Sequence, residues 1–219
     1  MIRRLLPPGV VAVEAFADVP GEDPFPGEED LVARAVHGRR REFITARRCA
    51  REALGHLGYP PAPIRPGARR EPRWPAGVVG SITHCAGYRA AAVAPATVVA
   101  GVGIDAEPYG PLPDGVLDTV TTEDEPTLLA GLVGTHASVH WDRLLFSAKE
   151  SVYKAWYPLT GRWLGFDDAR LSIDPAAATF TARVLVDGAR PDGGPPLTEL
   201  HGRYAVGRGL VVTAVVVTA

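Results

Sequence analysis

Apolar residues recur along the first half of the chain in two rhythms, and each predicts a different kind of element. From Asp30 to about Leu57 they return at spacings of three and four, which is the period of a helix. Gly58 and the prolines after it are expected to end this helix. Short apolar runs between turn residues predict strands instead, at Val10–Ala17, Val78–Ile82, Ala90–Ala94 and Val98–Ile104.

The second half repeats this order, with helices first and strands afterwards. Asp118–Val133 and Trp141–Tyr157 have helical periodicity, and Pro158 and Gly161 are expected to end the second helix. The strands expected after them are Leu171–Ile173, Thr179–Val186, Arg203–Val206 and Leu210–Val217. Helices and strands in this arrangement predict an α+β fold with antiparallel sheets.

Composition narrows the class of protein. The chain has 219 residues, 46% of them hydrophobic, so it can bury a core as one large domain or two small ones. The net charge of −2 gives no sign of nucleic-acid binding, and a site for a polyanion would have to be a local patch. The two cysteines, Cys49 and Cys85, form neither a CxxC pair nor a Cys/His cluster. We therefore expect no disulfide framework or zinc site, which suits a reducing cytosol.

Neither end of the chain resembles a membrane or export signal. Two prolines and Glu14 interrupt the apolar run at the N-terminus, unlike a secretory signal. The apolar tail GLVVTAVVVTA is too short to cross a bilayer as a helix, and its valines and threonines favour a buried strand. We expect a cytoplasmic protein without a membrane partner.

The first chemical signal is a pair of carboxylates at the end of a predicted strand, in the segment GVGIDAEP. Asp105 and Glu107 are two residues apart, so they point to the same side if the backbone stays extended. Like charges this close are costly unless a cation lies between them, and Mg²⁺ prefers such oxygen ligands. The small residues Gly101, Gly103 and Ala106 would leave room for a bulky ligand. The alternative is an exposed acidic turn, since turns favour aspartate.

The second signal is a charged set on the predicted helix that begins at Trp141. Glu150 and Lys154 are four residues apart and share a face, and Lys149 lies about 100° around the axis from Glu150. Such a set could supply one carboxylate to a metal and two ammonium groups to phosphates. The alternative is an ordinary surface salt bridge.

The third signal is basic. Arg39 and Arg47 belong to the arginine-rich first helix, and Arg69 and Arg70 lie in the proline-rich loop after it. Guanidinium groups suit bidentate phosphate binding, although a solvated helix surface is the commoner use of such runs. His84 lies in the segment SITHC at a strand end, where its ring could donate to a phosphate or be an ordinary structural group.

The order of these segments is more specific than any one of them. An arginine-rich helix is followed by SITHC, then GIDAEP, then FSAKESVYK. This order and wording resemble the Sfp-type 4′-phosphopantetheinyl transferases, most closely the siderophore-linked and actinobacterial branch, from about Arg39 to the end of the chain. The resemblance implies two similar α+β halves with pseudo-twofold symmetry and a cleft for coenzyme A between them. Residues 1–104 would supply the nucleotide and phosphate contacts, and residues 105–219 the metal site and the catalytic helix.

The resemblance also implies roles for individual residues. Asp105, Glu107 and Glu150 match the acidic Mg²⁺ positions of the family. Arg47 and Arg39 match residues that hold the 3′-phosphate of coenzyme A. The full set of implied coenzyme A contacts is Arg39, Arg47, Arg69, Arg70, Ser81, Thr83, His84, Lys149 and Lys154. Arg69 and Arg70 stand where the family often has a lysine, so the residue in contact there stays open.

The implied reaction moves 4′-phosphopantetheine from coenzyme A to a serine of an apo acyl or peptidyl carrier protein and releases 3′,5′-ADP. Asp105, Glu150 and Lys154 would be catalytic, with Glu150 or a metal-bound water as the base. The carrier stays open among fatty acid, polyketide, nonribosomal peptide and siderophore systems. A chain of two fused halves is expected to be a monomer, without a nucleic-acid partner.

Two other functions would use the same acidic and basic residues. One is a Mg²⁺-dependent hydrolase of coenzyme A or a related nucleotide, which would need no acceptor protein. The other is a non-catalytic module that binds coenzyme A or a carrier domain.

Overall fold

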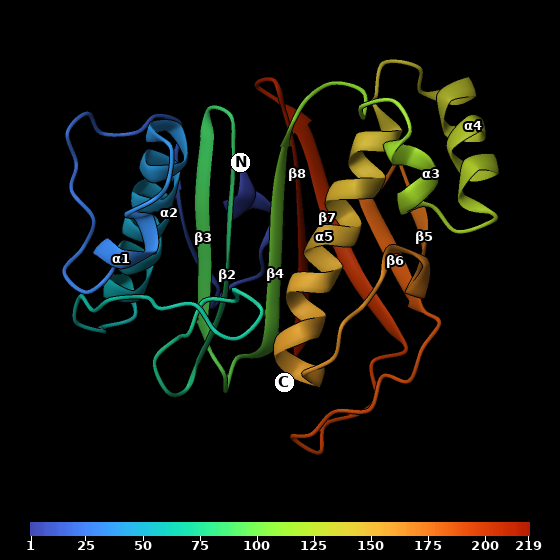
Figure 1. Ribbon diagram of the computed structural model, residues 1–219. Coiled ribbons are helices and arrows are strands. Elements are labelled where there is room, and N and C mark those ends of the chain that lie inside the picture. Colours follow the sequence, from blue (N-terminus) through green and yellow to red (C-terminus); the bar gives the residue numbers. More distant parts are fainter.

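Two antiparallel sheets form the centre of the molecule in the computed structural model, which describes all 219 residues (Figure 1). The small sheet has the order β1-β3-β2, with β1 at Val11–Ala15, β2 at Val78–Cys85 and β3 at Tyr88–Pro95. The large sheet has the order β4-β8-β7-β6-β5. Its strands are β4 (Val99–Pro108), β5 (Ala169–Asp174), β6 (Thr179–Val184), β7 (Glu199–Gly207) and β8 (Leu210–Thr218). The predicted α+β fold with antiparallel sheets is confirmed.

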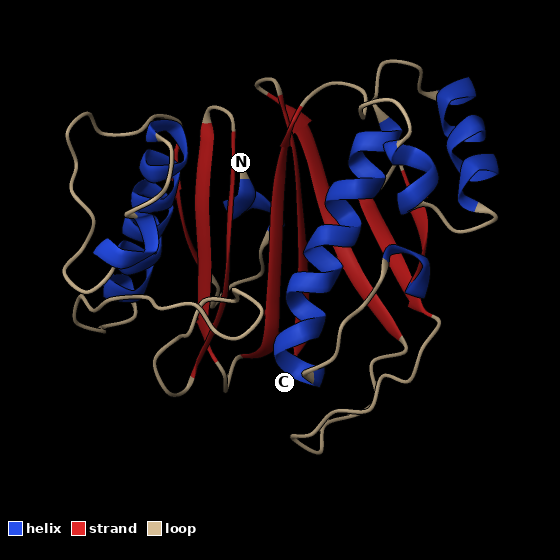
Figure 2. Ribbon diagram, in the orientation of Figure 1, coloured by secondary structure: helices blue, strands red, loops and turns tan.

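Helices cover the outer sides of the two sheets (Figure 2). The α-helices are α1 (Glu29–Val32), α2 (His37–His56), α3 (Val116–Val120), α4 (Glu125–Thr135) and α5 (Trp141–Thr160), with short 3₁₀ turns at Ile2–Leu5 and Phe166–Asp168. Each half has one 20-residue helix, α2 or α5, packed on its sheet. None of these helices has an apolar stretch that could cross a bilayer.

Two predicted helices are each divided in the structure. The region Asp30–Leu57 forms α1 and α2, because Val36 has an extended backbone between them. The region Asp118–Val133 forms α3 and α4, and Pro126 lies in the first turn of α4. A proline lacks the N–H that a helix interior needs but is tolerated in a first turn, so a new helix begins there.

The end of α5 also differs from the prediction. Pro158 does not end this helix, which continues to Thr160 and stops at Gly161. Gly161 has a left-handed backbone with φ of 67°, which favours glycine. Pro158 lies in the last turn, where the missing N–H removes one hydrogen bond, and Leu159 keeps that turn packed in the core.

Three apolar layers hold the helices and sheets together. Every residue of β3 from Tyr88 to Ala94 is buried, because the strand has a packed layer on each face. Ala91 and Val93 pack against α2, whereas Ala90 and Ala92 face the large sheet. The third and largest layer lies between the large sheet and α5.

The two halves meet where the edge strands β2 and β4 run side by side (Figure 1). The Ser81 hydroxyl accepts a hydrogen bond from the Ile104 backbone N–H at 3.1 Å, and the Thr83 hydroxyl accepts one from the Ala106 N–H at 3.0 Å. Side-chain hydroxyls thus satisfy the free edge of β4, which would otherwise carry unpaired backbone donors. The expected boundary after residue 104 falls within β4.

Candidate active site

A cleft of about 770 Å³ opens between the two halves. Its walls come from α1 and α2, the loop before β2, the strand β2, the start of β4 and the second half of α5. Most of the predicted site residues line it: Arg39, Arg47, Arg69, Arg70, Ser81, His84, Glu150 and Lys154. The fold therefore brings together segments that are more than 100 residues apart in the chain.

Asp105 lies at the acidic end of this site. Asp105 is 4% exposed, and its carboxylate accepts hydrogen bonds from Lys154 Nζ at 2.7 Å, from the Ser147 hydroxyl at 2.8 Å and from the Thr83 hydroxyl at 3.3 Å. Burial alone would lower the pKa of Lys154, but the carboxylate of Asp105 raises it. Lys154 is therefore a firmly charged ammonium group at the border of the cleft.

Glu107 follows Asp105 on the same side of β4 and pairs with Arg143. Arg143 Nη1 lies 3.1 Å from Glu107 Oε2, and Arg143 Nε donates to the Gly110 carbonyl. Burial and the nearby charge of Asp105 raise the pKa of Glu107, against the opposing effect of Arg143. The two carboxylates thus act on each other, as their spacing predicted.

Glu150 differs from the other two carboxylates because it makes no hydrogen bond in the structure while lining the cleft. Burial and the charge of Asp105 raise its pKa. A carboxylate with a raised pKa and free oxygens is suited to accept a proton from a bound hydroxyl.

The three carboxylates fit a divalent cation in chemistry but not as a closed cage. No three histidine, cysteine, aspartate or glutamate side chains stand close enough together to hold a metal as they are. Asp105 nevertheless raises the pKa of both Glu107 and Glu150, so negative charge accumulates here. Hard oxygen donors with excess negative charge are the kind of ligand that Mg²⁺ takes.

Arginine side chains form the basic wall of the cleft. Arg47 lies with its guanidinium 3.6 Å from the centre of the Phe43 ring, and its Nε donates to the Ile64 carbonyl at 3.0 Å. Burial lowers the pKa of Arg47 to about 10, so this side chain keeps its charge at neutral pH. Arg39 is more exposed and contacts both His84 and Glu42. Both arginines can reach an anion in the cleft.

His84 lies between the basic and acidic residues. Burial lowers its pKa to about 4, and the charge of Arg39 adds to this effect. The ring is therefore neutral at neutral pH, and it can donate one hydrogen bond to a phosphate oxygen.

Arg69 and Arg70 lie in a tight turn between Gly67 and Glu71. The Gly67 N–H donates to the Glu71 carbonyl at 2.7 Å, and Arg70 has a left-handed backbone with φ of 69°. The Glu71 carboxylate accepts from the Arg69 backbone N–H at 2.8 Å. The turn places two exposed guanidinium groups at the rim of the cleft, and either of them could bind a phosphate.

Lys149 is not brought to the cleft. It is 3% exposed and pairs with the buried Glu125 at 2.6 Å, and it also donates to the Phe166 carbonyl. One step along a helix turns about 100°, so Lys149 points away from the cleft that its neighbour Glu150 lines. Glu125 in turn accepts from the Leu171 N–H at 2.7 Å, so this pair joins α4, α5 and β5.

A polar stripe on α5 was not predicted from the sequence. Arg143, Ser147, Glu150 and Lys154 follow one another at spacings of four, three and four, and all face the acidic end or the cleft. This periodicity was visible in the sequence, since such spacings place residues on one helical face. Tyr153 was also missed, and it lines the cleft one turn from Glu150.

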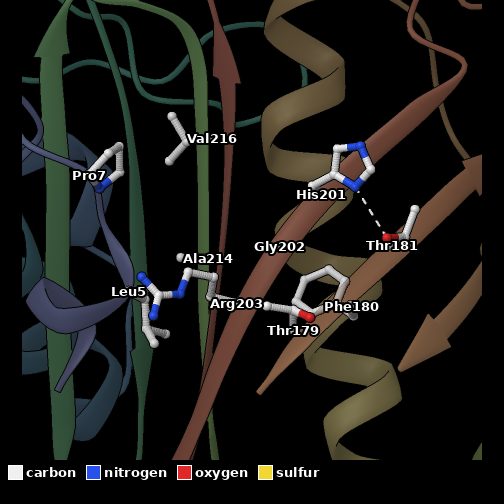
Figure 3. Close-up of a pocket in the computed structure, with 10 residues that line it drawn as sticks. All are labelled: Leu5, Pro7, Thr179, Phe180, Thr181, His201, Gly202, Arg203, Ala214 and Val216. Atoms are coloured by element: carbon white, nitrogen blue, oxygen red, sulfur yellow. Dashed lines mark hydrogen bonds between the residues drawn. The ribbon is translucent and has the colours of Figure 1, made fainter. Parts of the chain in front are cut away.

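A second hollow, of about 360 Å³, lies on the face of the large sheet that α5 does not cover (Figure 3). Polar residues of β6 and β7 form one side, where His201 is hydrogen-bonded to Thr181, and Arg203 extends toward Leu5 and Pro7 on the other. None of the predicted site residues lines this hollow.

Comparisons with known proteins agree with the two-part architecture. Residues 27–94 match the 4′-phosphopantetheinyl transferase N-terminal domain, and residues 101–193 match the 4′-phosphopantetheinyl transferase superfamily. The chain is 59% identical to the 4′-phosphopantetheinyl transferase Svp of Streptomyces mobaraensis, over 100% of the chain and 90% of that protein. It is 52% identical to the 4′-phosphopantetheinyl transferase PptT of Mycobacterium tuberculosis, over 93% of the chain and 90% of that protein.

A more distant relative comes from a siderophore system. Enterobactin synthase component D of Escherichia coli K12 is 38% identical over 58% of the chain and 64% of that protein. The similar proteins therefore include actinobacterial enzymes and a siderophore-linked enzyme, as the order of the motifs predicted.

Proposed function

The chain belongs to the 4′-phosphopantetheinyl transferase superfamily, and from this premise we propose that it moves 4′-phosphopantetheine from coenzyme A to a serine of an acyl or peptidyl carrier protein. The observation that carries this proposal is the cleft between the halves, which has arginines on one wall and a free carboxylate, Glu150, on the other. The phosphates of coenzyme A can bind to the arginines, and the hydroxyl of the carrier serine can give its proton to Glu150.

Coenzyme A is held mainly through its phosphates. Arg47 and Arg39 take the 3′-phosphate, because they are the guanidinium groups on the α2 wall of the cleft. His84 and Lys154 meet the pyrophosphate between the two walls, with Ser81 beside them. Arg69 and Arg70 close the rim. Thr83 supports the site from behind through its bond to Asp105.

The transfer step forms one bond and breaks one. The serine oxygen of the carrier attacks the phosphorus that bears pantetheine, and the bond from this phosphorus to the bridging pyrophosphate oxygen breaks. That oxygen leaves with 3′,5′-ADP. Glu150 accepts the serine proton, for which its raised pKa suits it. Lys154, held by Asp105, stabilises the charge on the phosphates during transfer.

Mg²⁺ is the cofactor that we propose for this site. Asp105, Glu107 and Glu150 would hold it, since their mutual repulsion favours a cation. When bound, Mg²⁺ would supply positive charge that neutralises the pyrophosphate and favours the departure of 3′,5′-ADP.

The proposal also covers the roles of the two halves and of Lys149, the oligomeric state and the location. We assign the nucleotide contacts to residues 1–104 and the catalytic helix to residues 105–219, and we assign Lys149 to holding α5 in place through Glu125. A single chain builds both walls of the cleft, which supports a monomer. Two free cysteines suit a cytoplasmic location.

The proposal is tested by intact mass spectrometry of an apo carrier protein incubated with the enzyme, coenzyme A and Mg²⁺. We expect the carrier to gain one phosphopantetheine group. Glu150→Ala and Asp105→Ala should each lower the initial rate by about 100-fold or more, because one removes the base and the other releases Lys154. Glu199→Ala, at an exposed position on β7, is the matched control and should keep the wild-type rate.

Three other results would overturn parts of this proposal. Breakdown of coenzyme A without a carrier would indicate a hydrolase. Binding of coenzyme A without transfer or breakdown would indicate a non-catalytic module. A near wild-type rate in a folded Glu150→Ala or Asp105→Ala protein would remove that residue from the catalytic site.

A further inference from the structure

Glu28 is a fully buried carboxylate behind the basic wall of the cleft, and only one of its oxygens has partners. Oε1 accepts a hydrogen bond from the Ile64 backbone N–H at 2.6 Å and from Arg51 Nη1 at 2.8 Å. Oε2 is buried and makes no hydrogen bond. A buried carboxylate is costly unless it is well paired, so all of the pairing of Glu28 depends on the position of Oε1.

The backbone of Ile64 connects Glu28 to Arg47. The Ile64 N–H donates to Glu28, and the Ile64 carbonyl accepts from Arg47 Nε at 3.0 Å. The other side of the Arg47 guanidinium is covered by the Phe43 ring at 3.6 Å. Two hydrogen bonds through the backbone of Ile64 thus connect Oε1 of Glu28 to the Arg47 guanidinium. The two terminal nitrogens of Arg47 make no hydrogen bond within the protein and remain available to a ligand in the cleft.

The charge of Glu28 acts on the same arginine. Arg51, Arg39 and Arg65 all carry positive charge close enough to disfavour the protonated form of Arg47. Glu28 is the carboxylate that opposes them. Two separate properties of Glu28, the place of its oxygen and its charge, can thus affect Arg47.

We propose that Glu28 is a positioning residue, which through Ile64 holds the Arg47 guanidinium where the cleft binds the 3′-phosphate of coenzyme A. Glu28 does not line the cleft and touches no ligand itself. This inference rests on the proposed function. It adds that the position of Glu28 makes the cleft prefer nucleotides that carry a 3′-phosphate over those that lack one.

Two conservative variants separate position from charge. Glu28→Asp keeps the charge but shortens the side chain by one methylene, which takes the carboxylate away from the Ile64 N–H. Glu28→Gln keeps an oxygen at the place of Oε1, and its amide nitrogen takes the place of Oε2, which makes no hydrogen bond. Calorimetry with 3′,5′-ADP and with 5′-AMP gives the preference for the 3′-phosphate as a ratio of dissociation constants.

We expect Glu28→Asp to reduce this preference about tenfold, which is the effect of one weakened charge-assisted hydrogen bond. Glu28→Gln should keep most of the wild-type preference. Glu14→Gln is the matched control, because Glu14 is also largely buried and accepts from the Ile2 N–H and the Tyr88 hydroxyl but does not line the cleft. It should leave the preference unchanged, even if it lowers the melting temperature.

The alternatives give different results. If Glu28→Gln loses the preference and Glu28→Asp keeps it, charge and not position is what matters, and the inference is wrong. It is also wrong if both variants keep the preference and only their stability falls. If the wild-type chain neither prefers 3′,5′-ADP nor modifies a carrier, the proposed function itself fails and the inference with it.

Discussion

At the scale of single residues, the neighbours Lys149 and Glu150 have opposite surroundings. Glu150 faces the cleft with free oxygens, whereas Lys149 is buried against Glu125 and the Phe166 carbonyl. Adjacent charged residues in a helix point in directions about 100° apart, so they serve one site only if that site wraps around the helix. Here it does not, and the lysine stabilises the packing of α5 instead.

Lys149→Met should therefore lower stability more than substrate binding. The change leaves Glu125 as an unpaired buried charge, and we expect the free energy of unfolding to fall by about 3–5 kcal/mol in urea titrations. Adding Glu125→Gln removes that charge and keeps one acceptor oxygen for the Leu171 N–H, but its amide nitrogen cannot accept from the Thr122 N–H. The double variant should therefore recover only part of the loss. A higher KM for coenzyme A at unchanged stability would instead show that Lys149 contacts the substrate.

At the scale of elements, the site depends on how closely α5 approaches β4. The glycines of β4 appeared to leave room for a ligand, but at Gly103 the helix itself fills that room. A Cβ atom on Gly103 would lie 1.9 Å from the Ser151 carbonyl oxygen, which belongs to the backbone of α5. This contact sets the distance between the strand that carries Asp105 and the helix that carries Glu150.

Gly103→Ala should push α5 away from β4, because two backbones cannot adjust as a side chain can. We expect a loss of about 3 kcal/mol in the free energy of unfolding and a fall in transfer rate, measured by urea unfolding and by carrier modification. Gly101→Ala is the matched control on the same strand. There the added Cβ would meet the end of the Leu159 side chain at 2.9 Å, which can move, so the effect should be smaller. Equal effects of the two changes would contradict this account.

At the scale of the whole molecule, the cleft exists because two sheets meet without merging. Hydroxyls of β2 complete the hydrogen bonds of β4, so the halves are joined by side chains and not by a continuous backbone ladder. The basic wall belongs to one half and Glu150 and Lys154 to the other. The position of the basic wall relative to Glu150 and Lys154 therefore depends on the stability of the contact between β2 and β4.

Ser81→Ala tests the junction. The change leaves the buried Ile104 N–H without its acceptor, and we expect it to lower the free energy of unfolding by about 1–3 kcal/mol. Ser151→Ala removes an equally buried hydroxyl that bonds only to the Ala148 carbonyl in its own helix, so it should cost less. Thermal unfolding of both proteins provides the comparison, and an equal or larger loss for Ser151→Ala would rule out a special role for Ser81.

The amino-acid sequence was enough to assign the fold class, the family and a set of charged and polar residues of which most line the cleft. Periodicity marked the main helices and strands, because burying one face of a helix or strand imposes a period on the residues. The order of SITHC, GIDAEP and FSAKESVYK identified the family. The stripe from Arg143 to Lys154 could also have been found in this way, since its spacing is local to one helix.

Which charged residues face one another depends on the packing of the helices and sheets. Whether Lys149 meets a phosphate or Glu125 depends on how α5 is rotated over the large sheet, and no local pattern contains that angle. The same holds for Gly103 against Ser151 and for Glu28, whose partners lie more than 20 residues away in α2 and at Ile64. Hydrogen bonds and close contacts between distant segments arise from packing, so the sequence could supply the candidate residues but not their partners.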